Sequence, residues 1–414
     1  MNASYPIRPI VMSELPQFMR VGDHAFNSNW PQDQVMAWEK LVFEVDRGLA
    51  AFDGDEIVGT ATAISFDLTV PGGGQVSTAG VTGVGVLPSH RRQGVLSSLM
   101  NRQIADIAAG SEPLAALFAS ESVIYGRYGY GAATSHLRYT IKRGEAQIPA
   151  PANRPRLRIC EPKDALASMK QVYDAVQVTR PGMLTRHKAY WDVALADPEF
   201  MREGSGPERC VLAEDETGLR GYALYSVKPK WSPGGLPNAE LFVRELYALD
   251  RDTTLTLWAD MFSRDLVGEI SVRSRPLDDP LLHELADPRR TRATIMDGLY
   301  IRLVDLPVAL TSRSYSSAVD VVIEVTDDRL PANAGRWRLQ AGGPADGVKP
   351  TCERTTAEPD LLMPVVVLGA AYLGGTRLGS LADAGFVTEV RPGALMALST
   401  AMWWDPAPWA PTSF

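Results

Sequence analysis

The stretch that organises the sequence reads Val84-Gly85-Val86-Leu87-Pro88-Ser89-His90-Arg91-Arg92-Gln93-Gly94-Val95-Leu96. It predicts a β-strand, a basic turn with one glycine, and a helix that starts at Val95 and carries apolar residues at helical spacing. The first amides of a helix have no intrahelical partner and lie at the positive end of the helix dipole. Gly94 lets the backbone approach an anion and Arg92 adds charge, so the turn is a candidate phosphate site.

A strand-to-helix turn with arginines is common in α/β proteins, so the wider pattern matters. This turn resembles the R-x-x-G-x-G/A signature of the GNAT superfamily of N-acetyltransferases, whose members bind the pyrophosphate of acetyl-CoA there. Val84 to Pro88 matches the strand that precedes the signature. Leu96 departs from it, because the general pattern has Gly or Ala at that position.

A second stretch strengthens the resemblance: Ala115-Ala116-Leu117-Phe118-Ala119-Ser120-Glu121-Ser122-Val123-Ile124-Tyr125-Gly126-Arg127-Tyr128-Gly129-Tyr130-Gly131. It is similar to the Y-x-x-x-G-[FY] element that follows the next strand in these enzymes. With the turn upstream and phenylalanine as the last residue, the sequence resembles the Eis (enhanced intracellular survival) family. The resemblance covers nearly the full chain and is strongest in residues 76 to 134.

Length and composition restrict the class of protein. A chain of 414 residues suggests two or three domains, and its 45% hydrophobic and 22% charged residues are ordinary for a globular protein. No apolar run reaches the ~18 residues of a spanning helix and the N-terminus has no signal-peptide pattern, so we expect a cytoplasmic protein without membrane contact.

Charge and ligand residues point away from two further classes. The three cysteines and five histidines are scattered, which argues against a disulfide framework and against a metal cofactor. The net charge of -8 argues against nucleic-acid binding and is compatible with a cationic substrate.

The chain in order predicts an α/β (α+β) fold in three domains. Ser13 is a candidate cap for a first helix, and a second helix is expected to carry Val35 to Val42. Leu49 to Phe66 predicts a hairpin with its turn at Asp53-Gly54-Asp55-Glu56. The proline-rich stretch 147–156 marks the first boundary. We expect domains at residues 1–150, 151–297 and 298–414.

An internal repeat predicts that the central domain is a second acetyltransferase-type fold. Residues 211–224 repeat the pattern of residues 49–62. The turn after the next strand reads Asp250-Arg251-Asp252-Thr253-Thr254, with two carboxylates and no glycine. Asp250 or Asp252 can cap the following helix, but negative charge there repels a pyrophosphate. We interpret the second copy as catalytically silent.

The sequence pattern changes near residue 300, where the C-terminal region begins. Residues 297–303, 321–325 and 335–339 read as strands. The family resemblance implies a sterol-carrier-type domain here, acting as a scaffold, and no motif in it argues for a bound lipid. The expected architecture is therefore tandem GNAT-type folds followed by a sterol-carrier-protein-like domain.

The resemblance also implies a cofactor site for acetyl-CoA, as co-substrate, without a metal. Val84, Gly85 and Val86 would present backbone groups to pantetheine and to the acetyl carbonyl. Ser120 and Glu121 would close the other side of the cofactor. The residues that would wrap its pyrophosphate are Arg92, Gln93, Gly94, Val95, Leu96 and Ser97.

Two residues are candidates for proton transfer. Tyr125 is the candidate general acid, because a phenol with a pKa near ~10 keeps its proton at neutral pH and can pass it to a thiolate. The alternative is an ordinary buried aromatic residue. The resemblance implies that the α-carboxylate of Phe414 is the base; with a pKa of ~3.3 to 3.7 it would orient an ammonium group and accept its proton, directly or through water.

The acceptor side is less defined. Phe26, Trp30 and Trp38 read as core or packing residues, but the family resemblance implies that this region forms a wall of the acceptor pocket. The expected acceptor is a small-molecule amine, which could be an aminoglycoside acetylated at several positions. Ser413 and the stretch Phe26-Asn27-Ser28-Asn29 supply no carboxylate for binding such an amine. Asp23, Asp33 and Asp67 are candidates to supply one instead. The alternatives are a non-catalytic acyl-CoA or lipid-binding protein and a protein or peptide lysine acetyltransferase. The family resemblance implies a homohexamer.

Overall fold

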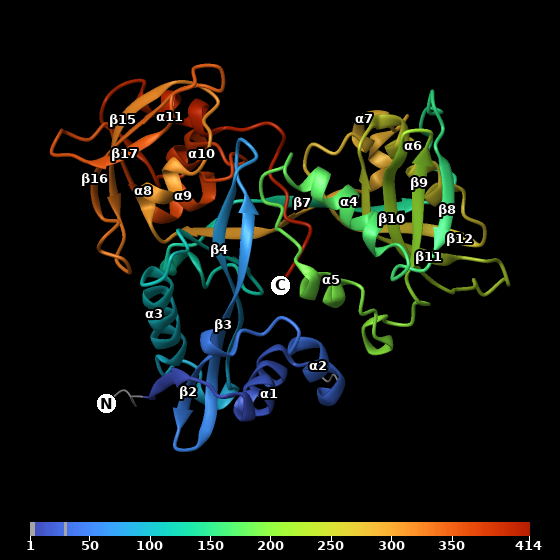
Figure 1. The fold of residues 1–414 in the computed structure, drawn as a ribbon, viewed down its shortest axis with the longest axis horizontal. Helices are drawn as coiled ribbons and strands as arrows, with labels where there is room; N and C mark the ends of the chain where they lie inside the picture. Colours follow the sequence, from blue (N-terminus) through green and yellow to red (C-terminus); the bar gives the residue numbers. More distant parts are fainter. Residues whose placement is uncertain (1–4, 29–30) are drawn as a thin grey trace. The chain divides into compact units, whose positions relative to one another are not determined.

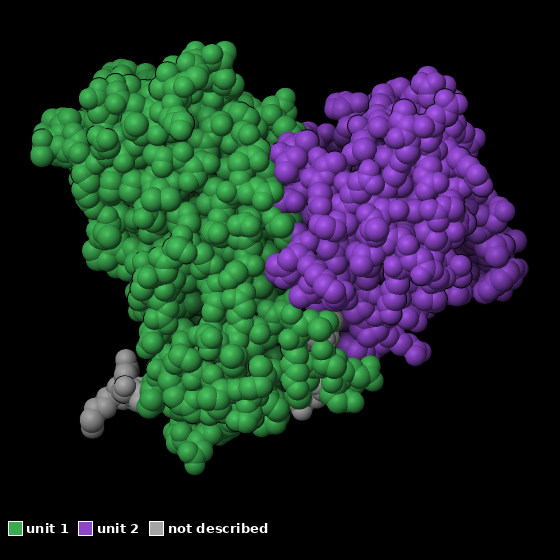
Figure 2. Space-filling view, in the orientation of Figure 1, with its two compact units in different colours: residues 1–134, 181–185, 298–414 green, residues 135–180, 186–297 purple. Residues whose placement is uncertain are grey.

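The computed structural model describes residues 5–28 and 31–414. The chain forms two compact units, which Figure 2 distinguishes by colour. The first unit comprises residues 1–134, 181–185 and 298–414, and the second comprises residues 135–180 and 186–297.

The N-terminal part of the first unit is built on a sheet that has seven strands within the described residues. In spatial order they are β1 (Ile7–Pro9), β2 (Leu49–Asp53), β3 (Glu56–Thr69), β4 (Gln75–Val86), β5 (Leu114–Phe118), β14 (Leu299–Leu303) and β6 (Gly131–Ala132). Helix α1 (Leu15–Phe26) packs on β3 and β4, and α3 (Val95–Ala108) packs on β2, β3 and β4. Figure 1 shows these two helices on opposite sides of the sheet, and α2 (Gln32–Glu39) beside α1.

Alternation along the strands explains the two layers of helices. Ala50, Phe52 and Ile57 belong to the buried cluster of α1, whereas Ala51 and Val58 belong to the cluster of α3. Successive strand residues point to opposite faces, so each face of β2 and β3 buries one of these sets.

The second unit contains a sheet of the same kind. Its strands are, in spatial order, β13 (Thr294–Asp297), β7 (Ser135–Lys142), β12 (Val267–Arg275), β11 (Ala239–Ala248), β10 (Gly218–Lys228), β9 (Arg209–Asp215) and β8 (Arg156–Cys160). Its helices are α4 (Leu166–Gln177), α5 (Lys188–Ala194), α6 (Arg251–Ser263) and α7 (Leu281–Glu284). The repeat predicted from the sequence is confirmed, since β9, β10, β11 and α6 follow the order of β2, β3, β4 and α3.

The C-terminal part of the first unit has a smaller sheet. Its order is β17 (Thr351–Arg354), β16 (Gly335–Ala341), β15 (Val319–Thr326), β18 (Leu361–Pro364) and β19 (Thr388–Glu389). The helices of this part are α8 (Leu306–Thr311), α9 (Val365–Ala371), α10 (Leu378–Asp383) and α11 (Ala394–Met402). In the described residues no helix is long and apolar enough to cross a bilayer.

Two strands cross the domain limits expected from the sequence. β7 precedes residue 150 but pairs with β12 and β13 of the second unit. β14 follows residue 298 but pairs with β5 and β6 of the first sheet. The limits at 150 and 298 stay predictions. One strand before the first limit belongs to the second sheet, and one strand after the second limit belongs to the first sheet.

Most local predictions agree with the structure. Helix α3 begins at Val95, and the hairpin turns at Gly54, which has a φ of 60°. The predicted cap at Ser13 is wrong: Ser13 lies in a 3-10 turn, and α1 starts after Glu14, with a proline in its first turn and no side-chain cap. α2 ends at Glu39, before the apolar residues that were expected to extend it to Val42.

Candidate active site

β4 and β5 separate at the centre of the first sheet. Their parallel pairing runs from Thr78 with Leu114 to Gly80 with Ala116. β4 continues to Val86 and stays paired with β3 on its other edge. Among the described strands, residues 81–86 therefore have no partner on the β5 side, and this edge includes the candidate cofactor residues Val84, Gly85 and Val86.

A bulge bends β4 within this segment. Between the pairs of Thr60 with Gly85 and of Thr62 with Thr82 the register shifts. Gly83 has a φ of 59°, and Thr60 Oγ1 donates a hydrogen bond of 2.8 Å to its carbonyl. A bulge increases the local twist, so β4 turns away from β5 where the two strands part.

The candidate phosphate turn has an uncapped helix start. Arg92 and Gly94 have φ values of 63° and 87°, and Gly94 is the N-cap of α3 without a side-chain hydrogen bond. A β-carbon at Gly94 would meet no atom within 4 Å among the described residues. The first helical bond runs from Ser98 N to Gly94 O, so the amides of residues 95–97 precede it. The turn can therefore offer backbone donors to an anion.

Side chains of the turn differ in what they contact. Gln93 accepts a hydrogen bond of 2.6 Å from Tyr5 and donates one of 3.1 Å to Ser89 O, so it holds the turn together. Arg92 is exposed. Leu96, at the position of a small residue in the general signature, is half-buried and packs on the clusters on both sides of α3. Its side chain contributes to the core, which explains why the turn tolerates it.

Tyr125 lies in the turn that follows β5. Its side chain is 8% exposed, and its carbonyl accepts hydrogen bonds from Tyr128 N at 3.0 Å and Tyr130 N at 3.3 Å. Burial, and then the carboxylate of Glu121 and the phenol of Tyr128, raise the pKa of Tyr125 above its usual value. Ser120 and Glu121, the other candidate cofactor residues, are exposed between β5 and this turn.

Phe414 is inserted next to the point where β4 and β5 separate. Its ring centroid lies 4.9 Å from that of Phe66 and 5.3 Å from that of Phe118. Thr82 Oγ1 donates a hydrogen bond of 3.3 Å to Phe414 O. The C-terminal residue is thus held on β4 by aromatic packing and by one polar contact.

The two candidates for proton transfer lie on opposite faces of the sheet. Tyr125 belongs to the buried cluster that contains Ala79 and Val81. Phe414 contacts Thr82 and the space at Gly80. Alternate residues of a strand point to opposite faces, so Tyr125 lies on the α3 face and Phe414 on the other face.

The acceptor candidates are only partly described. Phe26 ends α1 and is 51% exposed. Trp30 lies outside the described residues, and so does the side chain of Trp38 in α2. Asp67 accepts a hydrogen bond of 3.1 Å from Ser77, and Asp23 accepts one of 2.8 Å from Ser28.

The corresponding site of the second unit is filled by its own side chains. β11 and β12 also part, after the pair Val243 with Val272. Arg275 Nη1 donates a hydrogen bond of 2.8 Å to Leu246 O beyond that point, and Arg275 forms a buried ion pair of 2.8 Å with Asp279. A carbonyl on the edge that faces β12 is thus already bonded.

The start of α6 is also closed to an anion. Asp250 is the N-cap and accepts a hydrogen bond of 2.8 Å from Thr253 N, which confirms the predicted cap. It also pairs with Arg220 at 2.7 Å. Asp252 accepts hydrogen bonds from Ala152 N and Asn153 N. Carboxylates therefore occupy the place that phosphate would need.

The sequence did not indicate several contacts of the site. Thr82 and the rings of Phe66 and Phe118 carry no motif and reach Phe414 only through the fold. Tyr128 is buried and also forms a hydrogen bond of 3.1 Å with Ser97 in the first turn of α3. In the described residues no group of three or more His, Cys, Asp or Glu side chains could hold a metal ion.

Comparison with known protein families defines the class. Residues 6–133 and 182–303 match models of the acetyltransferase (GNAT) domain, and residues 306–411 match the sterol carrier protein domain. The protein is an acetyltransferase of the GNAT class, whose domains use acetyl-CoA as co-substrate, and it consists of two GNAT domains followed by a sterol-carrier-like domain.

Individual relatives identify the family. The chain is 44% identical over 390 residues to an uncharacterized N-acetyltransferase of Streptomyces coelicolor, covering 93% of each chain. It is 35% identical over 368 residues to the N-acetyltransferase Eis of Mycobacterium tuberculosis, covering 85% of each. The crystal structure of Eis1 from Mycobacterium abscessus superimposes with a TM-score of 0.83 at 32% identity, over 99% of this chain and 100% of that one. The chain belongs to the Eis family of N-acetyltransferases.

Proposed function

We propose that the N-terminal domain transfers an acetyl group from acetyl-CoA to a small-molecule amine at the opening between β4 and β5. Pantetheine would lie along residues 84–86, whose edge lacks a strand partner among the described residues. The pyrophosphate would bind at residues 92–97, where α3 starts without a side-chain cap, and Ser120 and Glu121 would flank the cofactor.

The placement of Tyr125 and Phe414 on opposite faces of β4 carries this proposal. An amine that attacks a thioester must lose a proton, and the departing thiolate must gain one. A base on one face and an acid on the other allow the amine to approach from one side while the thiolate leaves on the opposite side. The acetyl group would lie between them, where the pairing of β4 with β5 has ended.

Each group suits its role. A free alkyl amine has a pKa near ~10.4, so it arrives as a cation that the Phe414 carboxylate can orient. Where Phe414 ends the chain, its carboxylate accepts the proton of the amine, directly or through water. The raised pKa of Tyr125 keeps its phenol protonated at neutral pH, ready to protonate the thiolate.

The acceptor class needs a direct test. We propose an amine such as an aminoglycoside, acetylated at one or more positions, with Phe26, Trp30 and Trp38 at the acceptor side. Thiol release would be measured with acetyl-CoA and a panel of kanamycin-like polyamines, simple monoamines and lysine peptides. Turnover that is fastest with the polyamines supports the proposal. Turnover confined to lysine peptides indicates protein acetylation, and CoA binding without any turnover indicates a non-catalytic acyl-CoA-binding protein.

The remaining expectations belong to the same proposal. We propose that the central domain is catalytically silent, with Asp250, Asp252 and Arg275 occupying the places of phosphate and pantetheine. A homohexamer, a cytoplasmic location and the absence of nucleic-acid, membrane and metal partners also stay predictions.

A further inference from the structure

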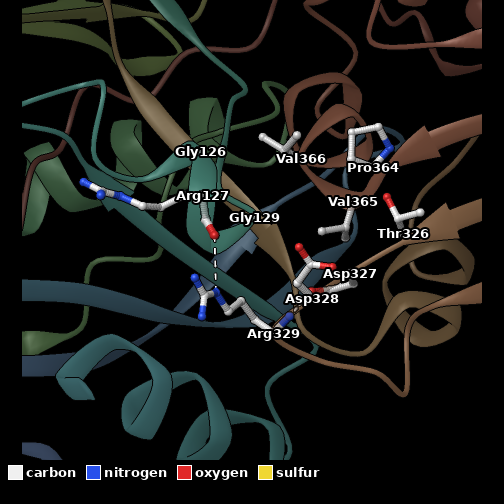
Figure 3. Close-up of a pocket in the computed structure, with 10 residues that line it drawn as sticks. All are labelled: Gly126, Arg127, Gly129, Thr326, Asp327, Asp328, Arg329, Pro364, Val365 and Val366. Atoms are coloured by element: carbon white, nitrogen blue, oxygen red, sulfur yellow. Dashed lines mark hydrogen bonds between the residues drawn. The ribbon is translucent and has the colours of Figure 1, made fainter. Parts of the chain in front are cut away.

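The turn that carries Tyr125 borders a cavity. The pocket has a volume of about 150 Å³. Gly126, Arg127 and Gly129 lie on one side of it (Figure 3). The other side is formed by residues 326–329, after β15, and by residues 364–366, where α9 begins. Apolar contacts reach the turn from the C-terminal domain, since Leu330 packs against the cluster that contains Tyr125 and Tyr128. Polar contacts add to them.

A buried ion pair supplies the main polar contact. Arg302, on β14, has a fully buried side chain, and its Nη1 donates a hydrogen bond of 2.5 Å to Tyr128 O. Its Nη2 lies 2.9 Å from both carboxylate oxygens of Asp327. The Asp327 side chain is 1% exposed. The guanidinium thus joins the turn to a residue of the sterol-carrier-like domain.

Asp327 is itself held in place. It accepts hydrogen bonds from Arg329 N and Leu330 N at 3.1 Å and from Asn333 Nδ2 at 3.2 Å. Both oxygens of this fixed carboxylate accept from Nη2 of Arg302, so charge-assisted hydrogen bonds hold one end of the guanidinium. β14 places Arg302 in the first sheet, and a residue of the C-terminal domain holds its guanidinium.

The backbone of Tyr128 connects Arg302 to Tyr125. Its backbone amide donates to Tyr125 O at 3.0 Å, while its carbonyl accepts from Arg302. A second, weaker contact runs from Arg329 Nε to Arg127 O at 3.4 Å, drawn as the dashed line in Figure 3. At Gly129, with a φ of 84°, an added β-carbon would lie 1.7 Å from Arg302 Nη1, so the guanidinium packs directly on the backbone.

We infer that Arg302 and Asp327 are positioning residues for the proton donor, so that the sterol-carrier-like domain takes part in catalysis by fixing the turn of Tyr125 beside this pocket. The inference rests on the proposed role of Tyr125 as general acid. Without the pair, the turn can shift into the cavity and the phenol loses its alignment with the departing thiolate. The pair bonds to the backbone of Tyr128, whose side chain bonds to Ser97 in the first turn of α3, so we expect a small effect on cofactor binding and a larger one on kcat.

The test compares variants of this ion pair with a matched pair elsewhere. Asp327→Asn and Arg302→Lys alter the pair, and Arg329→Ala removes the exposed second contact together with the guanidinium that lies 5.4 Å from the centre of the Tyr128 ring. Asp279→Asn is the control for loss of a buried arginine–aspartate pair, because Asp279 holds Arg275 in the second unit. Arg354→Ala controls for Arg329, since it is an exposed arginine of the same domain that donates to Ala334 O.

The expected result is a fall in kcat of about 10- to 100-fold for Asp327→Asn and Arg302→Lys, as for misplacement of a catalytic group. The acetyl-CoA Kd, measured by calorimetry, should stay within about twofold because no cofactor contact is removed. Arg329→Ala should show a smaller fall in kcat, and both controls none. Because the pair acts through Tyr125, Asp327→Asn should cause no further fall in a Tyr125→Phe background.

Two outcomes would overturn the inference while leaving the proposed function intact. In one, Tyr125→Phe loses turnover but Arg302→Lys and Arg329→Ala keep the wild-type kcat. In the other, Asp327→Asn is fully additive with Tyr125→Phe. If Asp327→Asn does not fold, Arg302→Lys and Arg329→Ala still give the answer. Wild-type turnover in Tyr125→Phe contradicts the proposed acid itself, and the inference then falls with it.

Discussion

The α-carbon of Gly80 faces a space that two aromatic rings already fill. A β-carbon there would lie 2.6 Å from Cε2 of Phe66 and 3.0 Å from Cε2 of Phe414. Both separations are shorter than the ~3.5 to 4.0 Å at which carbon atoms pack favourably. The position of the terminal ring therefore depends on the lack of one methyl group on β4.

Gly80→Ala should displace the Phe414 ring and lower kcat by about 10-fold, because a shift of the base misaligns it with the amine. Affinity for acetyl-CoA should change little, since the cofactor edge begins further along β4. Steady-state kinetics and calorimetry would measure the two effects. Gly379→Ala is the control, because a β-carbon at that glycine meets no described atom within 4 Å. Equal kcat values for the two variants would contradict the proposed role of Phe414.

Tyr125→Phe should retain acetyl-CoA binding and reduce kcat by about 10² to 10⁴, the usual contribution of a general acid. The active form of Tyr125 is protonated, so its contribution is lost only as the pH rises through its pKa. Because that pKa is raised above its usual value, kcat should show no alkaline fall from this group below about pH 10. Pre-steady-state thiol release across pH would measure this. If Tyr128→Phe loses as much activity as Tyr125→Phe, the assignment of Tyr125 as the proton donor is contradicted.

At the scale of elements, the first turn of α3 is the part that the sequence predicted best. The start at Val95 and the glycine at the N-cap agree with the structure because both follow from local rules of helix capping. The partner of β14 did not follow from such rules. The local sequence predicts a strand over residues 297–303, but it does not say beside which strand these residues lie.

Long-range side-chain contacts were equally beyond the sequence. Arg302 and Tyr128 are 174 residues apart, and neither belongs to a motif that names the other. The candidate residues Tyr125 and Phe414 came from family resemblance, and only the fold shows that they lie on opposite faces of β4. The acceptor side stays the least defined part, because Trp30 lies outside the described residues.

Arg92→Ala combined with Gly94→Asp should weaken acetyl-CoA binding by at least about 10-fold, because it removes a charge and places a carboxylate at the uncapped helix start. The main cost to the fold should be the backbone strain of an aspartate at a φ of 87°, since both residues are exposed and a β-carbon at Gly94 meets no described atom within 4 Å. Calorimetry would give the affinity, and circular dichroism would check the fold. Unchanged affinity would mean that the phosphates bind elsewhere.

The second copy should bind no cofactor. Calorimetric titration with acetyl-CoA is expected to give one molecule per chain, because carboxylates close the start of α6 and Arg275 bonds to β11. Asp250→Ala with Asp252→Ala should leave this stoichiometry and the turnover unchanged, since the turn still lacks a glycine and the edge of β11 stays occupied. A stoichiometry of two acetyl-CoA molecules per chain in the unmutated protein would contradict the proposal that the central domain is catalytically silent.

For the whole molecule, the proposed mechanism depends on groups from distant parts of one chain. The acid comes from the N-terminal domain, its support from Asp327, and the base from Phe414. Residues 181–185 also belong to this unit, and Trp409 N donates to Pro181 O at 2.8 Å shortly before the terminal phenylalanine. The last segment is therefore anchored before it reaches β4.

Adding a few residues after Phe414 should lower kcat by about 10²-fold or more, since the carboxylate becomes a neutral amide and the charge moves away. Deleting Phe414 should have the same effect. The same tag placed before Met1 is the control, and acetyl-CoA affinity should be equal in all forms. Equal turnover for the two tagged proteins would assign the base to a side chain or to water.

β14 lies between β5 and β6, which gives the N-terminal sheet an unusual order of synthesis. β5 ends at residue 118 and β14 at residue 303, so 303 - 118 = 185 residues are made between them. At about 5 to 20 residues per second, that interval lasts roughly 10 to 40 s on the ribosome. During this time β5 lacks the neighbour that later covers its edge, and an uncovered strand edge can pair with another nascent chain. An N-terminal fragment would carry this exposed edge permanently.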